Sequence, residues 1–211
     1  MTRILIVDDH AVVRRGIRHL LETALADAVI DEAGSAEECL GLAATNTWAL
    51  VILDLSLPGQ SGMELLKWFK ARCPTVLILV VSMHPEDQFI GRVLRAGAAG
   101  YLSKETAPEE LACAVRDVLA GRIYVSPQAR TNMDWLATPD TSYPLHHRLS
   151  DRELDVMLAL ANGKSVTEIS QKLSLSVKTV STYRSRILEK LGLTSNAELV
   201  RYVLQHDLID S

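Results

Sequence analysis

Five short apolar runs alternate with amphipathic stretches between residues 4 and 120. The runs, which are rich in Val, Ile and Leu, are Ile4–Val7, Val29–Ala33, Leu50–Asp54, Val76–Val81 and Gly100–Ser103. The stretches have apolar residues at helical spacing and cover Val12–Ala26, Glu37–Ala44, Met63–Arg72, Glu86–Ala96 and Pro108–Ala120. Continuous apolar strands must be covered on both faces, so the alternation predicts an α/β fold with a five-stranded parallel, doubly wound sheet. Functional residues in such a sheet lie at the carboxyl ends of the strands.

The pattern changes after Gly121. Pro127, Pro139 and Pro144 stand among Ser, Thr and Asp residues, which is typical of a linker. Four short helices are predicted beyond it, with capping boxes at Ser150, Ser165 and Ser195, a cap at Ser176, and closing glycines at Gly163 and Gly192. The turn Ser174-Leu175-Ser176 between two of them fits a helix-turn-helix. We therefore expect an α/β domain over 1–121, a linker over 122–147 and an all-α domain over 148–211.

Length and composition are those of a folded protein with two compact domains. The chain has 211 residues, of which 48% are hydrophobic. Its longest apolar runs are strand-sized, and the apolar stretch at the N-terminus is too short for a signal peptide. We expect no membrane association and a cytoplasmic location. Cys39, Cys73 and Cys113 are isolated in the sequence, so we expect reduced cysteines and neither a disulfide framework nor a zinc site.

The net charge of −4 is unevenly distributed. Residues 1–146 contain 13 Lys and Arg against 18 Asp and Glu, a charge of −5, and residues 147–211 contain 9 against 8, a charge of +1. The chain as a whole is not basic enough to indicate nucleic-acid binding, so such a role requires a local patch.

Three carboxylates stand where two of the predicted strands end. Asp8 and Asp9 follow the first strand, and Asp54 stands after the third. If these strands are neighbours, the carboxylates converge and repel one another unless a hard cation such as Mg²⁺ lies between them. A carboxylate beside Mg²⁺ can act as a nucleophile towards phosphorus. Ser82 after the fourth strand can donate a hydroxyl to a phosphoryl oxygen, and Lys104 after the fifth can supply a positive charge.

Four segments carry a specific resemblance. They are Val7-Asp8-Asp9-His10, Leu53-Asp54-Leu55-Ser56-Leu57-Pro58-Gly59, Ser82, and Gly97-Ala98-Ala99-Gly100-Tyr101-Leu102-Ser103-Lys104. Together they resemble the signature of response-regulator receiver domains, whose fold is of the flavodoxin and CheY type. The resemblance implies that Asp54 is the phosphoacceptor and that Ser82 and Tyr101 form a switch pair. It also implies Mg²⁺ ligation by Asp9 and Asp54, by Asp8 through water, and by the backbone carbonyl of Ser56.

The segment 176–192 is the most basic part of the C-terminal domain. Lys178, Arg184, Arg186 and Lys190 stand there against Glu189 alone. On a helix beginning at Val177, an apolar stripe of Val180, Ile187 and Leu191 lies opposite a polar face of Lys178, Ser181, Thr182, Ser185 and Glu189. Small polar residues on that face allow a helix to enter the major groove, and flanking cations neutralise phosphates. A charged outer face is common to amphipathic helices, so the charge alone does not decide for DNA.

The sequence around this helix resembles a known DNA-binding family. Leu149-Ser150-Asp151-Arg152-Glu153-Leu154, Glu168-Ile169, Leu175-Ser176-Val177-Lys178-Thr179-Val180 and Lys190-Leu191-Gly192-Leu193 resemble the LuxR-type helix-turn-helix of the NarL/FixJ response regulators. Lys178–Arg186 looks most like the GacA/UvrY and BvgA branches. Ser170 and Tyr183 depart from the usual alanine and histidine. The resemblance implies base contacts from Ser181, Thr182 and Ser185, and backbone contacts from Lys178, Thr179, Tyr183, Arg184 and Arg186.

The two resemblances together predict a two-component response regulator that is not an enzyme. A sensor histidine kinase would phosphorylate Asp54, and phosphorylation would control homodimerisation and binding to an inverted repeat in double-stranded DNA. Two alternatives stay open at this point. One is a phosphatase of the haloacid-dehalogenase type, although Ser56 stands where that chemistry needs a second Asp. The other is a phosphorylation-gated module whose C-terminal helices bind a protein.

Overall fold

The computed structural model describes residues 2–84, 86–127, 144–206 and 208–209. The chain divides into two compact units between residues 136 and 137, a position outside the described residues. The boundaries at 121 and 147 that the sequence predicts are not tested by this division. Each unit is described by itself.

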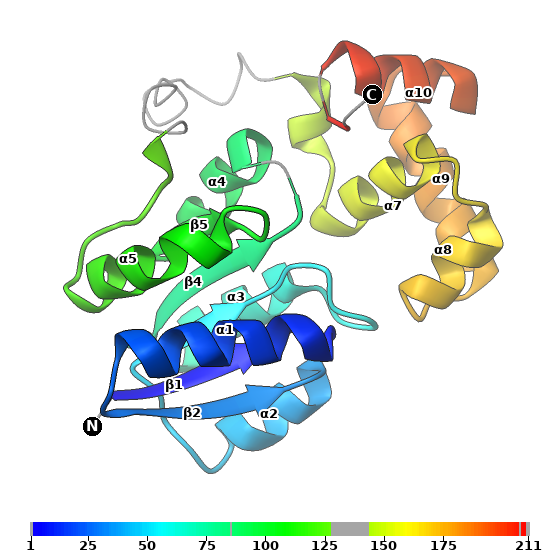
Figure 1. Ribbon diagram of the computed structural model, residues 1–211. Helices are drawn as coiled ribbons and strands as arrows, with labels where there is room; N and C mark the ends of the chain where they lie inside the picture. Colours follow the sequence, from blue (N-terminus) through cyan, green and yellow to red (C-terminus); the bar gives the residue numbers. More distant parts are fainter. Residues whose placement is uncertain (1, 85, 128–143, 207, 210–211) are drawn as a thin grey trace. The chain divides into compact units, whose positions relative to one another are not determined.

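The first unit is a five-stranded parallel sheet with the order β2-β1-β3-β4-β5 (Figure 1). Its strands are β1 Thr2–Val7, β2 Ala28–Ala33, β3 Leu50–Leu53, β4 Leu77–Ser82 and β5 Gly100–Ser103. Its helices are α1 Ala11–Ala24, α2 Ala36–Ala43, α3 Gly62–Arg72, α4 Glu86–Arg95 and α5 Ala107–Leu119. The predicted α/β sheet is confirmed, and the strand bounds differ from the predicted runs by one or two residues at the starts of β1, β2 and β4 and at the ends of β3 and β4. β3 ends at Leu53, so Asp54 follows it, and Ser82 is the last residue of β4.

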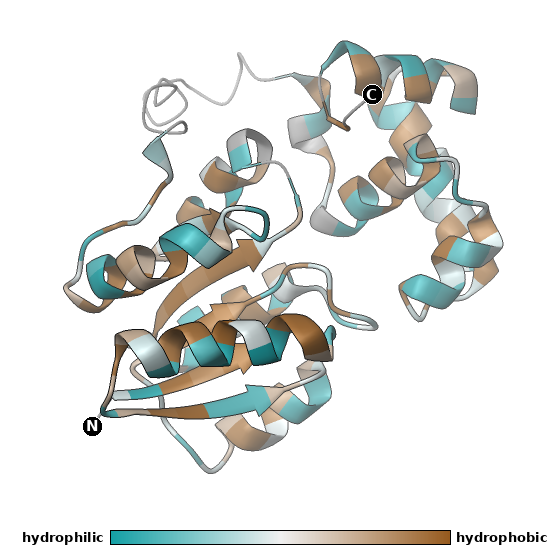
Figure 2. Ribbon diagram, viewed as in Figure 1, coloured by the Kyte–Doolittle hydropathy of each residue, from teal (hydrophilic) through white to brown (hydrophobic). Residues whose placement is uncertain are grey.

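The central strands form the core of this unit. β1, β3 and β4 are almost entirely buried, because α1 and α5 pack together on one face while α2 and α3 lie behind the sheet in the view of Figure 1. The edge strand β2 is more polar (Figure 2), since Asp31 and Glu32 point to arginines of β1 and α1. The sheet therefore presents the ends of β1, β3 and β4 from a rigid apolar base.

The first residues after α5 continue the first unit. Tyr124 forms a parallel bridge with Gly100, and Tyr124, Val125 and Ser126 are buried. Gly100 is required here, because a Cβ at this position would lie 2.7 Å from the carbonyl oxygen of Tyr124. The predicted linker 122–147 thus overlaps with packed residues at this end, and again at its other end, where a short 3-10 helix begins at Leu145.

Within the described residues, the second unit contains that 3-10 helix, η2 Leu145–Arg148, and four α-helices. They are α7 Asp151–Ala161, α8 Val166–Lys172, α9 Val177–Leu191 and α10 Asn196–Gln205. The capping boxes at Ser150 and Ser165 and the caps at Ser176 and Gly192 are confirmed. The prediction of a capping box at Ser195 is wrong for one of its two hydrogen bonds. The Ser195 hydroxyl accepts from the Glu198 N–H, but the Glu198 carboxylate accepts from Thr194 instead of returning to Ser195.

The turn between α8 and α9 makes the helix-turn-helix geometry possible. Ser174 adopts φ +53°, a left-handed conformation that is unfavourable for a residue with a Cβ. The N–H of Leu175 donates to the carbonyl of Ser170 at 2.8 Å and closes the end of α8. Ile169, Val180 and Ile187 are buried in this unit, and Leu199 and Val203 of α10 are also fully buried. The spacing of Leu199, Val203 and Leu204 predicts one apolar face for this helix, but Leu204 is exposed.

Candidate functional site

An acidic cluster lies at the carboxyl edge of the sheet, where β1 and β3 are neighbours. Asp8 and Asp9 follow β1, and Asp54 follows β3, with its N–H donating to the carbonyl of Val7 at 2.9 Å. Ligand atoms of Asp8, Asp9, His10 and Asp54 all lie within 4.8 Å of one another. Asp8 and Asp54 are buried, while Asp9 and His10 are exposed. The convergence that the sequence predicts is therefore present.

Lys104 joins the two buried carboxylates. Its Nζ lies 2.7 Å from Asp54 Oδ2 and 2.7 Å from Asp8 Oδ2, and its side chain is only 8% exposed. Burial raises the pKa of Asp54, and Lys104 offsets only part of that effect. Burial acts to lower the pKa of Lys104, but the attraction of Asp54 and Asp8 exceeds it and leaves that pKa above its usual value. The single charge of Lys104 is thus shared by two buried carboxylates, and the cluster keeps a net negative charge.

The backbone holds Asp54 in place from both sides. The N–H of Ser56 donates to Asp54 Oδ1 at 3.1 Å, and the N–H of Gly62 donates to the carbonyl of Leu55 at 3.0 Å. A Cβ at Gly62 would lie 2.0 Å from the carbonyl oxygen of Asp54, so only glycine allows α3 to begin this close to the site. The position of the buried carboxylate is therefore fixed by close backbone packing.

Ser82 and Tyr101 both contact the loop after β4. The Ser82 hydroxyl accepts from the N–H of His84 at 3.3 Å. Tyr101, a residue of β5, is fully buried and its hydroxyl donates to the carbonyl of His84 at 2.6 Å. The two residues of the predicted switch pair thus share one loop residue, and Tyr101 is in a buried rotamer.

Two histidines at the site were given no role by the sequence. His84 Nε2 lies 3.1 Å from Ser56 Oγ, and the ring stacks on Phe89 with centroids 4.3 Å apart. His10 Nδ1 lies 2.8 Å from Asp9 Oδ1 and 3.2 Å from Asp8 Oδ1. Because His10 follows Asp8-Asp9 directly in the sequence, its place beside these carboxylates could have been predicted. His84 is 28 residues from Ser56, and no local pattern links them.

The donor atoms of the cluster suit a hard divalent cation. Three carboxylates offer oxygen ligands within coordination range of a shared ion, and oxygen is what Mg²⁺ and Ca²⁺ prefer. The excess negative charge left by the Lys104 pairing also favours a cation. The residues present therefore fit the metal that the sequence predicts.

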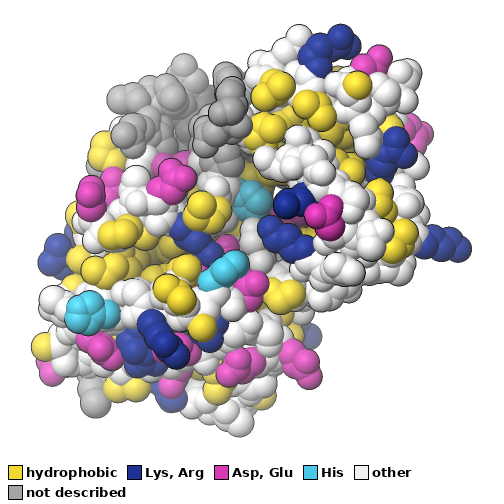
Figure 3. All heavy atoms as spheres, turned by 45° about the vertical axis from the view of Figure 1, so that its right-hand side comes forward, with side chains coloured by type: hydrophobic (Ala, Val, Ile, Leu, Met, Phe, Trp, Pro, Cys, Tyr) yellow, Lys and Arg dark blue, Asp and Glu magenta, His cyan; other side chains and the backbone are white. Residues whose placement is uncertain are grey.

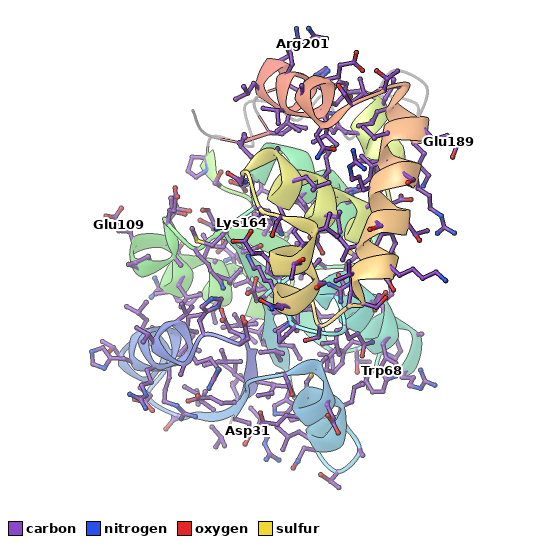
Figure 4. All side chains as sticks on the ribbon, turned by 90° about the vertical axis from the view of Figure 1, so that its right-hand side faces the viewer. Asp31, Trp68, Glu109, Lys164, Glu189 and Arg201 are labelled. Atoms are coloured by element: carbon purple, nitrogen blue, oxygen red, sulfur yellow. The ribbon has the colours of Figure 1, made fainter. Side chains whose placement is uncertain are left out.

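The surface of α9 separates into two faces as expected. The residues of the apolar stripe, Val180, Ile187 and Leu191, are buried. The residues of the opposite face are exposed and are Lys178, Ser181, Thr182, Ser185 and Glu189. Figure 4 shows Glu189 projecting outward from α9. Figure 3 shows Lys and Arg side chains interspersed with acidic and apolar ones on the face in view, so positive charge is local rather than a broad field.

Several polar groups of α9 are already engaged within the unit. The hydroxyls of Ser181, Thr182 and Ser185 donate to backbone carbonyls one turn earlier. Arg184 Nε donates to Asn196 Oδ1 at 2.7 Å, and Lys190 Nζ donates to Glu153 Oε2 at 2.6 Å. Of the predicted DNA-contacting residues, Lys178 and Arg186 are exposed, while Thr179, Tyr183 and Arg184 are partly buried. Arg184 and Lys190 also hold α9 against its neighbours.

The remaining sequence predictions concern cysteines and membranes. All three cysteines are free thiols, and Cys39 is buried, which raises its pKa to about 12. Cys73 is partly exposed and Cys113 is exposed, so only Cys39 packs as a fully buried apolar residue. None of the helices in the described ranges has the length and apolarity that a membrane crossing requires.

Two family models match the two units. Residues 4–116 match the response regulator receiver domain, and residues 147–203 match the bacterial regulatory proteins of the luxR family. These matches place the chain among regulators of transcription and leave no ground for the phosphatase alternative. They also favour DNA over a protein as the target of the C-terminal helices.

Relatives and solved structures agree with the two matches. The chain is 38% identical to the response regulator GacA of Pseudomonas aeruginosa, over all of this chain and 99% of that protein. It is 36% identical to the response regulator UvrY of Escherichia coli, over all of this chain and 97% of that protein. A structure of the RcsB response regulator of Salmonella typhimurium has a TM-score of 0.70 at 27% identity, covering 97% of both chains. This chain belongs to the two-component response regulators of the NarL/FixJ family, in the GacA/UvrY branch, with a receiver domain and a LuxR-type helix-turn-helix.

Proposed function

We propose that Asp54 accepts a phosphoryl group and that its phosphorylation controls DNA binding by the second unit. The observation that carries the proposal is the buried Asp54 carboxylate at the end of β3, which faces Asp8 and Asp9 and shares a single lysine with Asp8. The Asp54 oxygen attacks phosphorus, an acyl phosphate forms, and the bond to the donor breaks. Lys104 Nζ neutralises charge on a phosphoryl oxygen. The donor is a sensor histidine kinase or a small phosphodonor.

The acidic cluster would hold Mg²⁺ during this transfer. Asp9 and Asp54 would ligate the ion directly, Asp8 through water, and Ser56 through its backbone carbonyl. When bound, the ion offsets the negative charge of the transferring oxygens. Asp9 is the exposed carboxylate among Asp8, Asp9 and Asp54, which leaves it accessible for exchange of the ion.

Ser82 and Tyr101 would pass the change to the rest of the unit. The Ser82 hydroxyl turns from the N–H of His84 to a phosphoryl oxygen, and this shift alters the loop whose carbonyl accepts from Tyr101. Two arrangements of the loop, of Tyr101 and of α4 then differ in population according to phosphorylation.

The second unit would bind double-stranded DNA through α9. Ser181, Thr182 and Ser185 would contact base edges, and Lys178, Thr179, Tyr183, Arg184 and Arg186 would contact the backbone. A solved RcsB structure, 27% identical with a TM-score of 0.66, is described as bound to promoter rprA in the presence of the phosphomimetic BeF₃⁻, and another is described as two RcsB dimers bound to two parallel DNAs. By this likeness the chain forms a homodimer when phosphorylated and binds an inverted repeat.

The domain limits and location follow from this assignment. We place the receiver domain at 1–121, the linker at 122–147 and the DNA-binding domain at 148–211, with residues at both ends of the linker packed on a unit. A regulator that binds DNA acts in the cytoplasm.

Incubation of the chain with acetyl phosphate and Mg²⁺ tests the proposal. Intact mass should rise by one phosphoryl group, and peptide mapping should locate it at Asp54. Chelation with EDTA should prevent incorporation. Incorporation at another residue, or none in the wild type, would contradict the assignment.

A further inference from the structure

Arg14 folds back from α1 onto the turn that carries the acidic cluster. Its Nη1 donates to the backbone carbonyl of Asp8 at 2.6 Å, and its Nε donates to Glu32 Oε2 at 3.3 Å. The side chain is 18% exposed and lies between the ends of β1 and β2. The Arg14 guanidinium thus pairs with Glu32 and at the same time donates a hydrogen bond to the carbonyl oxygen of Asp8.

The carbonyl that Arg14 holds belongs to the peptide between Asp8 and Asp9. The orientation of this peptide decides where both carboxylates point, because it is the single rigid plane that joins their Cα atoms. A charge-assisted bond is short and directional, so it restricts that plane more than a bond from a neutral donor would. Asp8 and Asp9 are the two cluster residues on the β1 side of the site.

We propose that Arg14 is a positioning residue for the cation site, acting through the Asp8–Asp9 peptide. The proposal rests on the proposed function, since it assumes that the cluster binds Mg²⁺. Groups that orient metal ligands affect metal affinity roughly 10- to 100-fold although they never touch the ion.

A simple charge effect has the opposite sign. Arg14 is a cation near an anionic cluster, so its removal reduces repulsion and should tighten Mg²⁺ binding if charge alone matters. Loss of positioning should instead weaken binding. The sign of the change in affinity therefore separates the two effects.

Arg18 provides a matched control one turn along the same helix. It also pairs with Glu32, and its Nη2 donates to the carbonyl of Ile30 at 3.0 Å, but no contact with Asp8 is present among its hydrogen bonds and ion pairs in the described residues. Arg18→Gln removes the same charge and one of the two Glu32 pairs. It leaves the Asp8–Asp9 peptide held.

The test is a titration of the full metal-free chain with Mg²⁺ alone. The NMR chemical shifts of the backbone amides of Asp9 and Asp54 report binding. Arg14→Gln should raise the Kd for Mg²⁺ about tenfold, at the low end of the range for such groups. Arg18→Gln should change the Kd less than about twofold, since screening weakens a charge effect at a distance. Arg14→Lys keeps the charge but cannot bridge the carbonyl and Glu32 as a planar fork does, so its Kd should lie between wild type and Arg14→Gln.

The outcomes are distinguishable. Unchanged or tighter Mg²⁺ binding by Arg14→Gln would overturn the inference, and so would equal weakening by Arg18→Gln. A wild type that shows no Mg²⁺-dependent shifts would overturn the proposed cation site itself. Thermal unfolding of each variant shows whether the sheet is intact, and if Arg14→Gln is unfolded, the Arg14→Lys titration decides alone.

Discussion

Each unit contains a buried carboxylate paired with a lysine, and the two pairs differ in how completely they are compensated. Asp54 shares Lys104 with Asp8, and burial leaves its pKa above the usual value. Burial also acts to raise the pKa of Glu153, but Lys190 and the N–H and hydroxyl of Ser150 outweigh it and lower that pKa. The charge of the first carboxylate is under-compensated, whereas the partners of the second outweigh the effect of its burial.

This difference distinguishes a reactive carboxylate, Asp54, from a structural one, Glu153. A buried acid whose charge is incompletely offset is costly to the fold, and such groups persist where chemistry needs them. Glu153 closes a capping box at the start of α7 and fastens α9 through Lys190, so its charge stabilises the helix-turn-helix. The buried Asp54 carboxylate therefore lowers the stability of the receiver but supplies its reactive group. The Glu153–Lys190 pair instead stabilises the DNA-binding unit.

The largest expected effect is the loss of function in Asp54→Asn. This variant should lose phosphoryl incorporation and all Mg²⁺-dependent response to beryllofluoride, because the nucleophilic oxygen and a cation ligand are both gone. Its free energy of unfolding should be equal to or higher than that of the wild type, since an under-compensated charge is removed. Urea unfolding of metal-free protein measures this. A clear loss of stability would mean that Asp54 is a structural residue like Glu153.

Glu153→Ala should show the reverse pattern. Removing a buried group that accepts from Lys190 and from Ser150 should cost the second unit about 2–3 kcal/mol. Hydrogen exchange resolved by peptide should become faster over α7 and α9 and stay unchanged over β1, β3 and β4. Glu198→Ala, which removes a partly exposed carboxylate at the start of α10, serves as the control and should have a smaller effect. Equal effects of the two variants would refute the special role of Glu153.

The stabilisation by Glu153 should depend on pH. Because the folded-state pKa is below the unfolded value of about 4.3, the carboxylate stabilises the fold above that value and loses its effect as pH falls through the folded pKa. The stability difference between wild type and Glu153→Gln should therefore be constant near neutrality and shrink below about pH 4. Urea unfolding at several pH values measures it. A difference that grows on acidification would reverse the sign that we assign.

Ser174→Gly should give the smallest change. Glycine adopts φ +53° without the penalty for a Cβ but loses more backbone entropy on folding, so we expect a gain of about 0.5–1 kcal/mol in the second unit. Thermal unfolding measures the gain, and DNA affinity should be unchanged. Loss of DNA binding without loss of stability would show that Ser174 is needed for DNA binding. The second unit would then also contain a residue that is unfavourable for the fold but needed for function.

The sequence predicts the elements of both units and most of the site for a clear physical reason. Parallel strands end at one edge, so Asp8, Asp9, Asp54 and Lys104 converge whenever the strands are adjacent, and helix caps depend on residues only three apart. Contacts that depend on rotamers and long separations are not predictable in this way. Examples are the hydrogen bond between His84 and Ser56, the contact of Arg14 with the carbonyl of Asp8, and the acceptance by Glu198 from Thr194 rather than from Ser195. The burial of Tyr101 likewise depends on the carbonyl of His84.

The central claim, that Asp54 controls DNA binding by α9, is tested most directly by selecting DNA from a random duplex pool. Wild type and Asp54→Asn are each compared with and without Mg²⁺ and beryllofluoride, and affinities are then measured on the selected site. We predict an enriched inverted repeat that the wild type binds roughly 5- to 150-fold more tightly with the phosphoryl mimic, a typical range for coupled sites, and no effect of the mimic on Asp54→Asn. Equal affinity of the wild type with and without the mimic, or an equal response of Asp54→Asn, would contradict the claim.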